Sequence, residues 1–324
     1  MQSQTIARRR RADTLGVHSL QRFVFSVPDL AEAAKFYRAF GLDVRETGNR
    51  LDLFAFGHPH RWGSIYKGTG GKRLEYIAFG AYPEDFDTLV SRLRAKGIAT
   101  TRPHALADDD GVWITDPEGI AVEIVRADNV AWDGVRAPAP SRAPHGSPAA
   151  PPRSKAGKTQ PQRLSHILMF TSDVMRSVAF YRDVLGLRLS DHSGDIIAFL
   201  HGPHGSDHHM IAFAKSDGPG LHHSSWVVPS IDAVGIGMEQ MQAEGYGHGW
   251  GVGRHVIGSN YFRYVRDPWG SFAEFSADID YIPFDVEWKV GDHAPEDSFY
   301  VWGPPVPDDF VINHETAVRR AASQ

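Results

Sequence analysis

The 324-residue sequence contains no cysteine. Disulfide bonds, thiolate metal sites and cysteine nucleophiles are therefore excluded together. The absence also fits a reducing compartment, so we expect a cytoplasmic protein.

The sequence also lacks the features that would direct it to a membrane or to nucleic acid. No apolar run approaches the roughly 18 residues that a membrane span needs. A basic run from Arg8 to Arg11 is followed by no apolar segment, so we interpret it as a solvated arm rather than a signal peptide. The formal net charge of −5 gives no electrostatic reason to expect a nucleic-acid partner. With 42% hydrophobic and 23% charged residues, the composition is that of a soluble globular protein.

A proline-rich stretch at residues 136–163 divides the chain into halves of similar length. It holds seven of the 21 prolines and almost no apolar residues, so we expect a partly extended linker. The predicted units are an N-terminal domain at 1–135, this linker, a C-terminal domain at 164–290, and a tail at 291–324 that packs on or near the functional pocket.

The two halves repeat each other. Leu20 to Leu42 and Leu164 to Leu187 both predict a strand, a loop, an amphipathic helix and a Gly-Leu pair at the helix end. Matches in the same order along both halves indicate an internal duplication. The two further matches are LEYIAF at 74–79 with LHHSSW at 221–226, and DPEGIAVE at 116–123 with DPWGSFAE at 267–274.

Within each half, the order strand, helix, strands occurs twice. The predicted fold class is therefore α+β, with tandem βαβββ modules whose strands curl into two half-barrel cups and whose helices lie outside. We expect function inside a cup. In the second half we predict a helix at 231–244, strands at 195–200, 208–214, 224–228, 261–266 and 272–275, and a flexible glycine-rich lip at 247–253.

The two copies differ at three matched positions. Arg22, Tyr76 and Glu123 in the first half correspond to His166, His223 and Glu274 in the second. Glu274 lies inside an apolar strand, and a carboxylate is costly to bury there unless it meets a cation or a metal. Two neutral imidazoles and one carboxylate are the ligand set of a non-haem Fe(II) site with open coordination positions. We therefore predict a metal centre in the second half and a scaffold role, without a metal site, for the first.

The second half also carries a longer motif. It reads Gly253-Arg254-His255, then Phe262-Arg263-Tyr264, then Asp267-Pro268-Trp269-Gly270, then Glu274. In this motif the chain resembles the type I extradiol ring-cleaving dioxygenases (catechol 2,3-dioxygenase-like) of the vicinal oxygen chelate superfamily. The proline-rich stretch is longer than the linker usual in that family.

The resemblance implies a role for each site residue. The metal ligands would be His166, His223 and Glu274, and His209 would be the acid–base residue. His255 and Tyr264 would bind the substrate oxygens and stabilise developing charge, and Asn260 would also bind substrate. Because side chains alternate along a strand, His222 and His223 are expected on opposite faces, and the repeat register favours His223. Of His208 and His209, we favour His209, on one face with Ile211 and Phe213.

The resemblance further implies the reaction. The cofactor would be Fe(II), with Mn(II) also suited to these ligands, and the partners would be O₂ and a catecholic substrate. A neutral monocyclic catechol or trihydroxybenzene is favoured, and we expect a homo-oligomer. Two alternatives stay open: a glyoxalase-like metal-dependent isomerase or epimerase, and a bleomycin-resistance-like binding module without enzymatic activity. Outside the site, His201 and His204 are expected to be solvated.

Overall fold

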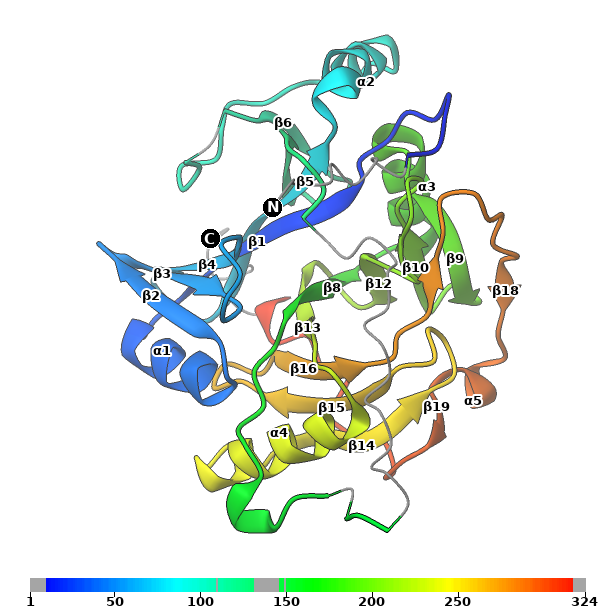
Figure 1. Ribbon diagram of the computed structural model, residues 1–324. Helices are drawn as coiled ribbons and strands as arrows, with labels where there is room; N and C mark the ends of the chain where they lie inside the picture. Colours follow the sequence, from blue (N-terminus) through cyan, green and yellow to red (C-terminus); the bar gives the residue numbers. More distant parts are fainter. Residues whose placement is uncertain (1–9, 109, 131–145, 149, 317–324) are drawn as a thin grey trace, which may run out of the picture.

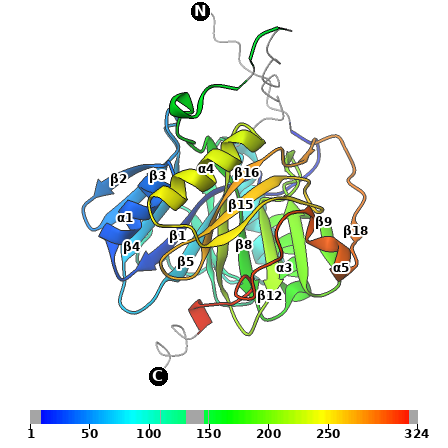
Figure 2. The same cartoon turned by 90° about the horizontal axis from the view of Figure 1, so that it is seen from below.

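The computed structural model describes residues 10–108, 110–130, 146–148 and 150–316 (Figure 1). Two large sheets, one from each half, lie side by side, and the longer helices cover their outer faces (Figures 1 and 2). The predicted α+β class of paired βαβββ modules is confirmed.

The sheet of the first half has the strand order β2-β3-β4-β1-β5-β7-β6. Its strands are β1 (Ser19–Val27), β2 (Asp43–Thr47), β3 (Arg50–Phe54), β4 (Arg61–Lys67), β5 (Arg73–Ala81), β6 (Val112–Thr115) and β7 (Ala121–Arg126), and its helices are α1 (Leu30–Ala39) and α2 (Pro83–Ala95). A single turn of 3₁₀ helix, η1 (Arg153–Lys155), lies in the proline-rich stretch before the second half.

The sheet of the second half has the order β18-β9-β10-β12-β8-β13-β16-β15-β14-β19. Its strands are β8 (Arg163–Thr171), β9 (Arg188–Ser193), β10 (Ile197–His201), β12 (Ile211–Lys215), β13 (Gly220–Val227), β14 (Gly249–His255), β15 (Tyr261–Arg266), β16 (Phe272–Ala277), β18 (Gly291–Asp292) and β19 (Tyr300–Trp302). The helices are α3 (Val174–Leu185), α4 (Ile231–Ala243) and α5 (Pro295–Ser298), and β11 (Ser206–Asp207) pairs with β17 (Tyr281–Ile282) outside the sheet.

The first helix of each half begins and ends where the repeated sequence predicts. The carboxylate of Asp29 caps α1 by accepting from the backbone N–H groups of Ala31 and Glu32, and Asp173 caps α3 by accepting from Arg176. Gly186 ends α3 in the left-handed conformation, with φ of 77°.

Side-chain alternation separates a shared core from a cup. On β16, Ala273 and Phe275 point into the main hydrophobic core, while Phe272 and Glu274 point to the other face. The main core joins both halves: the rings of Phe40 and Phe275 stack with centroids 3.9 Å apart. The concave face of the second sheet is thereby left for a pocket.

The repeated aspartates of the two DPxG turns connect the halves reciprocally. Lys72 of the first half forms a fully buried ion pair with Asp267 of the second. In the other direction, the hydroxyl of Tyr181 donates to Asp116 at 3.1 Å. The turn that precedes Glu274 is therefore fixed from outside its own domain.

The predicted glycine-rich lip is wrong, because these residues form strand β14, which pairs with β15 and β19. A Cβ on Gly249 would lie 2.0 Å from the carbonyl oxygen of Tyr264, and one on Gly253 would lie 2.6 Å from the ring of Phe262. The glycines thus permit close packing of β14 against β15 rather than flexibility.

Candidate metal centre and its pocket

Three adjacent strands bring the predicted metal ligands together. His166 on β8 and Glu274 on β16 both pair with Ser225 on the intervening β13, and His223 lies two residues earlier on β13. His166 Nε2 lies 3.3 Å from His223 Nε2 and 3.4 Å from Glu274 Oε2. His223 Nε2 lies 3.7 Å from the same carboxylate oxygen. Among the described residues, this is the one group of three or more His, Asp or Glu side chains whose ligand atoms converge.

The chemistry of these residues fits a divalent metal. Glu274 is fully buried, and its Oε2 accepts no hydrogen bond of ordinary geometry from the described residues. An orphaned buried carboxylate oxygen facing two imidazole nitrogens is costly in the metal-free protein and is satisfied by a cation. Burial alone would raise the pKa of Glu274, but His166 and His255 outweigh it and lower that pKa.

The neighbours of His166 set its orientation. Ser165 Oγ donates to Asp207 at 2.7 Å, so its oxygen accepts from His166 Nδ1 at 3.2 Å. A proton on Nδ1 leaves Nε2, in the neutral ring that binds a metal, with its lone pair toward the centre.

Asn260 lines the cavity and also hydrogen-bonds to the carboxylate of Glu274. Its Nδ2 donates to Glu274 Oε1 at 3.1 Å and to Ser276 Oγ at 3.0 Å. The amide therefore orients Glu274 and leaves Oε2 to face the histidines, a role the sequence had not indicated.

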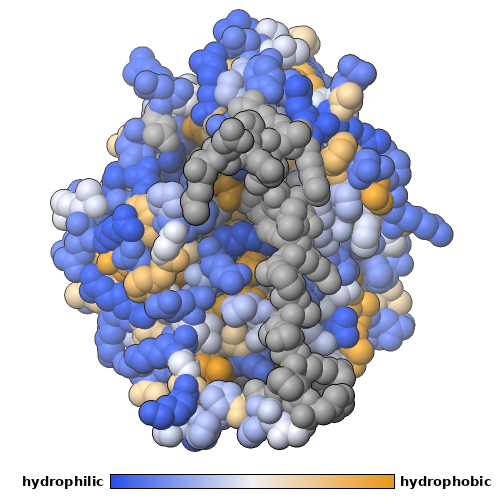
Figure 3. Space-filling view, in the orientation of Figure 1, coloured by the Kyte–Doolittle hydropathy of each residue, from blue (hydrophilic) through white to orange (hydrophobic). Residues whose placement is uncertain are grey.

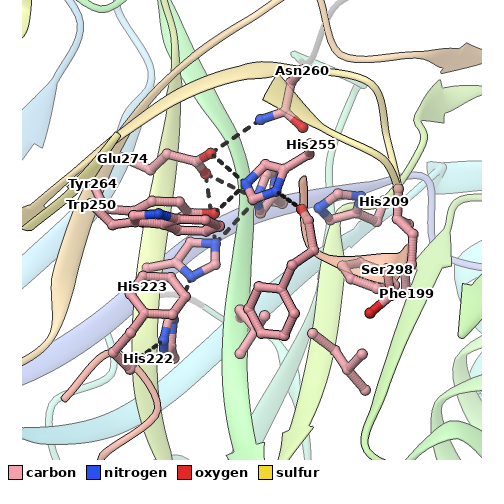
Figure 4. A pocket seen from close by; sticks show the side chains of 16 residues that line it. Phe199, His209, His222, His223, Trp250, His255, Asn260, Tyr264, Glu274 and Ser298 are labelled. Atoms are coloured by element: carbon pink, nitrogen blue, oxygen red, sulfur yellow. Dashed lines mark hydrogen bonds and ion pairs between the residues drawn. The ribbon is translucent and has the colours of Figure 1, made fainter. Parts of the chain in front are cut away.

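His209 also lines the cavity (Figure 4). Behind it, His208 and Asp191 continue a chain of side-chain contacts. His208 Nε2 donates to Asp191 Oδ2 at 2.7 Å, and His208 Nδ1 lies 3.0 Å from His209 Nδ1. In a neutral His208, Nδ1 accepts from His209, so His209 carries a lone pair on Nε2. Burial lowers the pKa of His209 well below its usual value, assisted by the surrounding histidines, which keeps that lone pair free.

His255 and Tyr264 lie on the other side of Glu274. The hydroxyl of Tyr264 lies 2.9 Å from His255 Nε2, and His255 Nδ1 donates to the carbonyl of Phe299 at 2.7 Å. Burial and the charge of Glu274 raise the pKa of Tyr264, so the phenol keeps its proton. Figure 4 shows His255 and Tyr264 beside the carboxylate, both within reach of a molecule in the pocket.

The cavity has a volume of about 550 Å³ including its mouth, and it has no lysine or arginine among its lining residues. Leu168, Phe199 and Ile257 form its apolar wall, and Ile197 lies beside them. The rest of the lining is His166, His209, His222, His223, Trp250, His255, Asn260, Tyr264, Glu274, Ser298, Phe299 and Phe310.

Two arguments from strand alternation are wrong. His222 and His223 both line the cavity, because a β-bulge between Leu221 and His223 adds His222 as an extra residue opposite β8. His209 reaches the pocket although Ile211 and Phe213 belong to the main core, because β12 begins only at Ile211.

Other residues were misjudged or missed. His201 and His204 are buried rather than solvated. His201 ends strand β10, and His204 lies in the turn that follows it. Trp250 and the tail residues Ser298, Phe299 and Phe310 line the pocket. The sequence predicted a tail that packs on or near the pocket, but not which of its residues line it.

At the matched positions of the first half, Arg22 Nη2 lies 2.8 Å from Glu123 Oε2, and both groups are buried. Tyr76 is buried beside them. A guanidinium thus faces the glutamate on the side where the second half has two imidazoles.

Comparison with known proteins gives consistent matches. Residues 19–124 and 163–275 both match the Glyoxalase/Bleomycin resistance protein/Dioxygenase superfamily. The chain is 46% identical to metapyrocatechase 2 of Cupriavidus necator over 299 residues, covering 92% of this chain and 93% of that protein. It is 26% identical to biphenyl-2,3-diol 1,2-dioxygenase of Metapseudomonas furukawaii over 307 residues, covering 89% and 94%.

Solved structures share the fold. An extradiol ring-cleaving dioxygenase from B. fuscum superposes with a TM-score of 0.72 at 21% identity, covering 92% of this chain and 82% of that one. A Mn(II)-bound glyoxalase from Novosphingobium aromaticivorans gives 0.70 at 25% identity, covering 91% and 94%.

In the part of the chain that the structure describes, no helix is long and apolar enough to cross a membrane. The face seen in Figure 3 is mainly hydrophilic, with small separate hydrophobic patches.

Proposed function

Because the chain belongs to the Glyoxalase/Bleomycin resistance protein/Dioxygenase superfamily, we propose that it is an extradiol dioxygenase that cleaves a catechol-type ring with O₂. The observation that carries the proposal is the group His166, His223 and Glu274, with His209, His255 and Tyr264 around it in one cavity. These are the ligand type and the acid–base and hydrogen-bonding groups that ring cleavage needs.

His166, His223 and Glu274 would hold Fe(II), or Mn(II), which the same ligands suit. When bound, the metal supplies coordination positions for both catechol oxygens and O₂ and lowers the pKa of a coordinated hydroxyl. Three protein ligands leave those positions available, and Asn260 keeps the carboxylate oriented.

His209 is proposed as the acid–base residue. Its Nε2 lone pair can accept the proton of a substrate hydroxyl and later return it to an oxygen of the opening ring. As the ring becomes an imidazolium, its Nδ1–H strengthens its hydrogen bond to His208, and the carboxylate of Asp191 behind His208 stabilises the charge.

His255 and Tyr264 are proposed to bind the oxygens on the other side of the substrate. The Tyr264 hydroxyl donates to His255 Nε2 in the free protein and can donate instead to a substrate oxygen. Fixed donors in a buried site stabilise negative charge as it develops.

The lining favours a neutral substrate. A carboxylated catechol would bring its charge into a cavity whose lining contains no lysine or arginine, which is unfavourable. An alkyl- or chlorocatechol would place its substituent against Leu168, Phe199 and Ile257.

A glyoxalase-like isomerase is the second candidate, and the shared fold with a Mn(II)-bound glyoxalase favours it. Against it, the converging group has three members among the described residues. It is also surrounded by the acid–base candidate His209 and by the hydrogen-bonding side chains of His255 and Tyr264. A binding module would need neither feature. The homo-oligomeric state and the cytoplasmic location stay predictions.

The test is O₂ consumption after anaerobic loading with Fe(II). Catechol, 3-methylcatechol and 4-methylcatechol should each consume O₂ and form a yellow ring-opened product. His223→Ala and Glu274→Ala should abolish both signals and lower the iron content. Full iron occupancy without O₂ consumption on any diol would contradict the proposal and favour the isomerase.

A further inference from the structure

Three main-chain carbonyls of the C-terminal tail accept hydrogen bonds from three rings of the pocket. The carbonyl of Phe299 accepts from His255 Nδ1 at 2.7 Å, and that of Pro304 accepts from Trp250 Nε1 at 2.9 Å. The carbonyl of Phe310 accepts from His222 Nε2 at 2.7 Å. The tail therefore contacts the site through its backbone as well as through its side chains.

A carbonyl oxygen can only accept, so each of these contacts fixes where the proton lies. His222 must carry a proton on Nε2. In a neutral imidazole ring, a proton on Nε2 leaves a lone pair on Nδ1.

The position of the proton on His222 determines the position of the proton on His223. His222 Nδ1 lies 2.7 Å from His223 Nδ1 and, with its lone pair, accepts a hydrogen bond from it. With its proton on Nδ1, neutral His223 has its lone pair on Nε2, which faces His166 and Glu274. The opposite tautomer would present an N–H to the centre and could not bind a metal.

Hydrogen bonds to Glu315 hold the tail in place next to His222. The Glu315 carboxylate accepts from the backbone N–H of Leu221 through Oε1 and from that of Leu74 through Oε2, both at 2.8 Å. Leu221 precedes His222, and Leu74 is its counterpart in the other half. The Phe310 ring also packs against the His222 ring, with centroids 4.7 Å apart.

We propose that the tail from Phe299 to Glu315 is a positioning element of the metal centre, in which the Phe310 carbonyl, acting through His222, selects the metal-binding tautomer of His223. The inference rests on the metal centre of the proposed function. Neither His222 nor Phe310 is a metal ligand in it.

The experiment measures Mn²⁺ binding to the metal-free protein under anaerobic conditions, by the electron paramagnetic resonance signal of free Mn²⁺. His222→Phe keeps a buried ring but removes the acceptor for His223, and it should weaken binding about 10–100-fold. His222→Asn carries an oxygen at the position of Nδ1 and should keep most of the affinity. Nitrogen-15 NMR of the metal-free protein should show His223 protonated on Nδ1 in the unchanged protein and a mixture of tautomers in His222→Phe.

A second pair of variants tests the tail itself. A chain ending at Pro305 loses the Phe310 carbonyl and should also weaken Mn²⁺ binding, whereas a chain ending at Thr316 keeps Phe310 and Glu315 and should not. Thermal unfolding shows which variants are folded. If folded His222→Phe keeps the Mn²⁺ affinity and the His223 tautomer of the unchanged protein, the inference is overturned and the proposed function still stands. Absence of Mn²⁺ binding to the unchanged protein would instead overturn the metal centre, and this inference with it.

Discussion

Arg22 and Glu123 form a buried ion pair at 2.8 Å in the first half, where the second half places His166 and Glu274. The two glutamates occupy matched strand positions, and both are completely buried. In one half a guanidinium supplies the positive charge that the carboxylate needs, and in the other half a metal would supply it. Duplication has thus preserved the acid while changing its partner.

The first prediction concerns this pair. Arg22→Met leaves the Glu123 charge buried without its cation, so the free energy of unfolding should fall by about 3–5 kcal/mol. The double variant Arg22→Met with Glu123→Leu should recover much of that loss. Urea denaturation measures both, and metal content should stay at one ion per chain. Loss of metal in the folded double variant would show that the first half contributes to the site.

The second prediction concerns the residues behind His209. Asp191→Asn removes the charge that, through His208, stabilises protonated His209, so kcat should fall roughly 10-fold or more while iron content is retained. His209→Asn should lower kcat by about 10²–10⁴-fold. Steady-state kinetics with 4-methylcatechol give the values. Asp195→Asn, an exposed change two residues beyond β9, is the matched control. Equal kcat in Asp191→Asn and the control would show that Asp191 does not assist His209 through His208.

The third prediction concerns substrate charge. Because the cavity lining contains no lysine or arginine, kcat/KM for 4-methylcatechol should exceed that for 3,4-dihydroxybenzoate by about 100-fold. Phe199→Arg places a cation in the apolar wall and should narrow this ratio. A ratio near one in the unchanged protein would mean that a cation outside the described lining meets the carboxylate.

The fourth prediction concerns His204, which is buried outside the metal site. Burial lowers its pKa to about 4, whereas the unfolded chain has a value near 6.5. Between these values the unfolded state binds a proton that the folded state does not, so stability falls as pH decreases from about 6.5 to about 4. The contribution is up to about 3 kcal/mol. In His204→Phe, the urea midpoint should fall less between pH 6.5 and pH 4.5 than in the unchanged protein.

The duplicated pattern made the fold and the converging ligands predictable. His166, His223 and Glu274 could be found because Arg22, Tyr76 and Glu123 occupy the same positions in a copy without the ligand set. Side chains alternate along a strand, so the apolar neighbours Ala273 and Phe275 face the core and Glu274 faces the cup.

Departures from regular geometry could not be predicted. The bulge that places His222 beside His223 has no sequence marker, and the start of β12 after His209 reverses the face expected from alternation. The contacts of Phe299 and Phe310 depend on backbone carbonyls, whose position follows from tertiary packing rather than from residue type. Asn260 was predicted to bind substrate, whereas its hydrogen bond to Glu274 joins the residue before β15 to β16 and required the structure.

The most direct test of ring cleavage is a single turnover with ¹⁸O₂. The Fe(II)-loaded protein is mixed anaerobically with one equivalent of 4-methylcatechol and then exposed to ¹⁸O₂, and the product is analysed by mass spectrometry. Extradiol cleavage predicts one O₂ consumed per ring and a yellow ring-opened product containing both labelled atoms. An unlabelled product of unchanged composition, formed without O₂ consumption, would contradict the account and identify an isomerase.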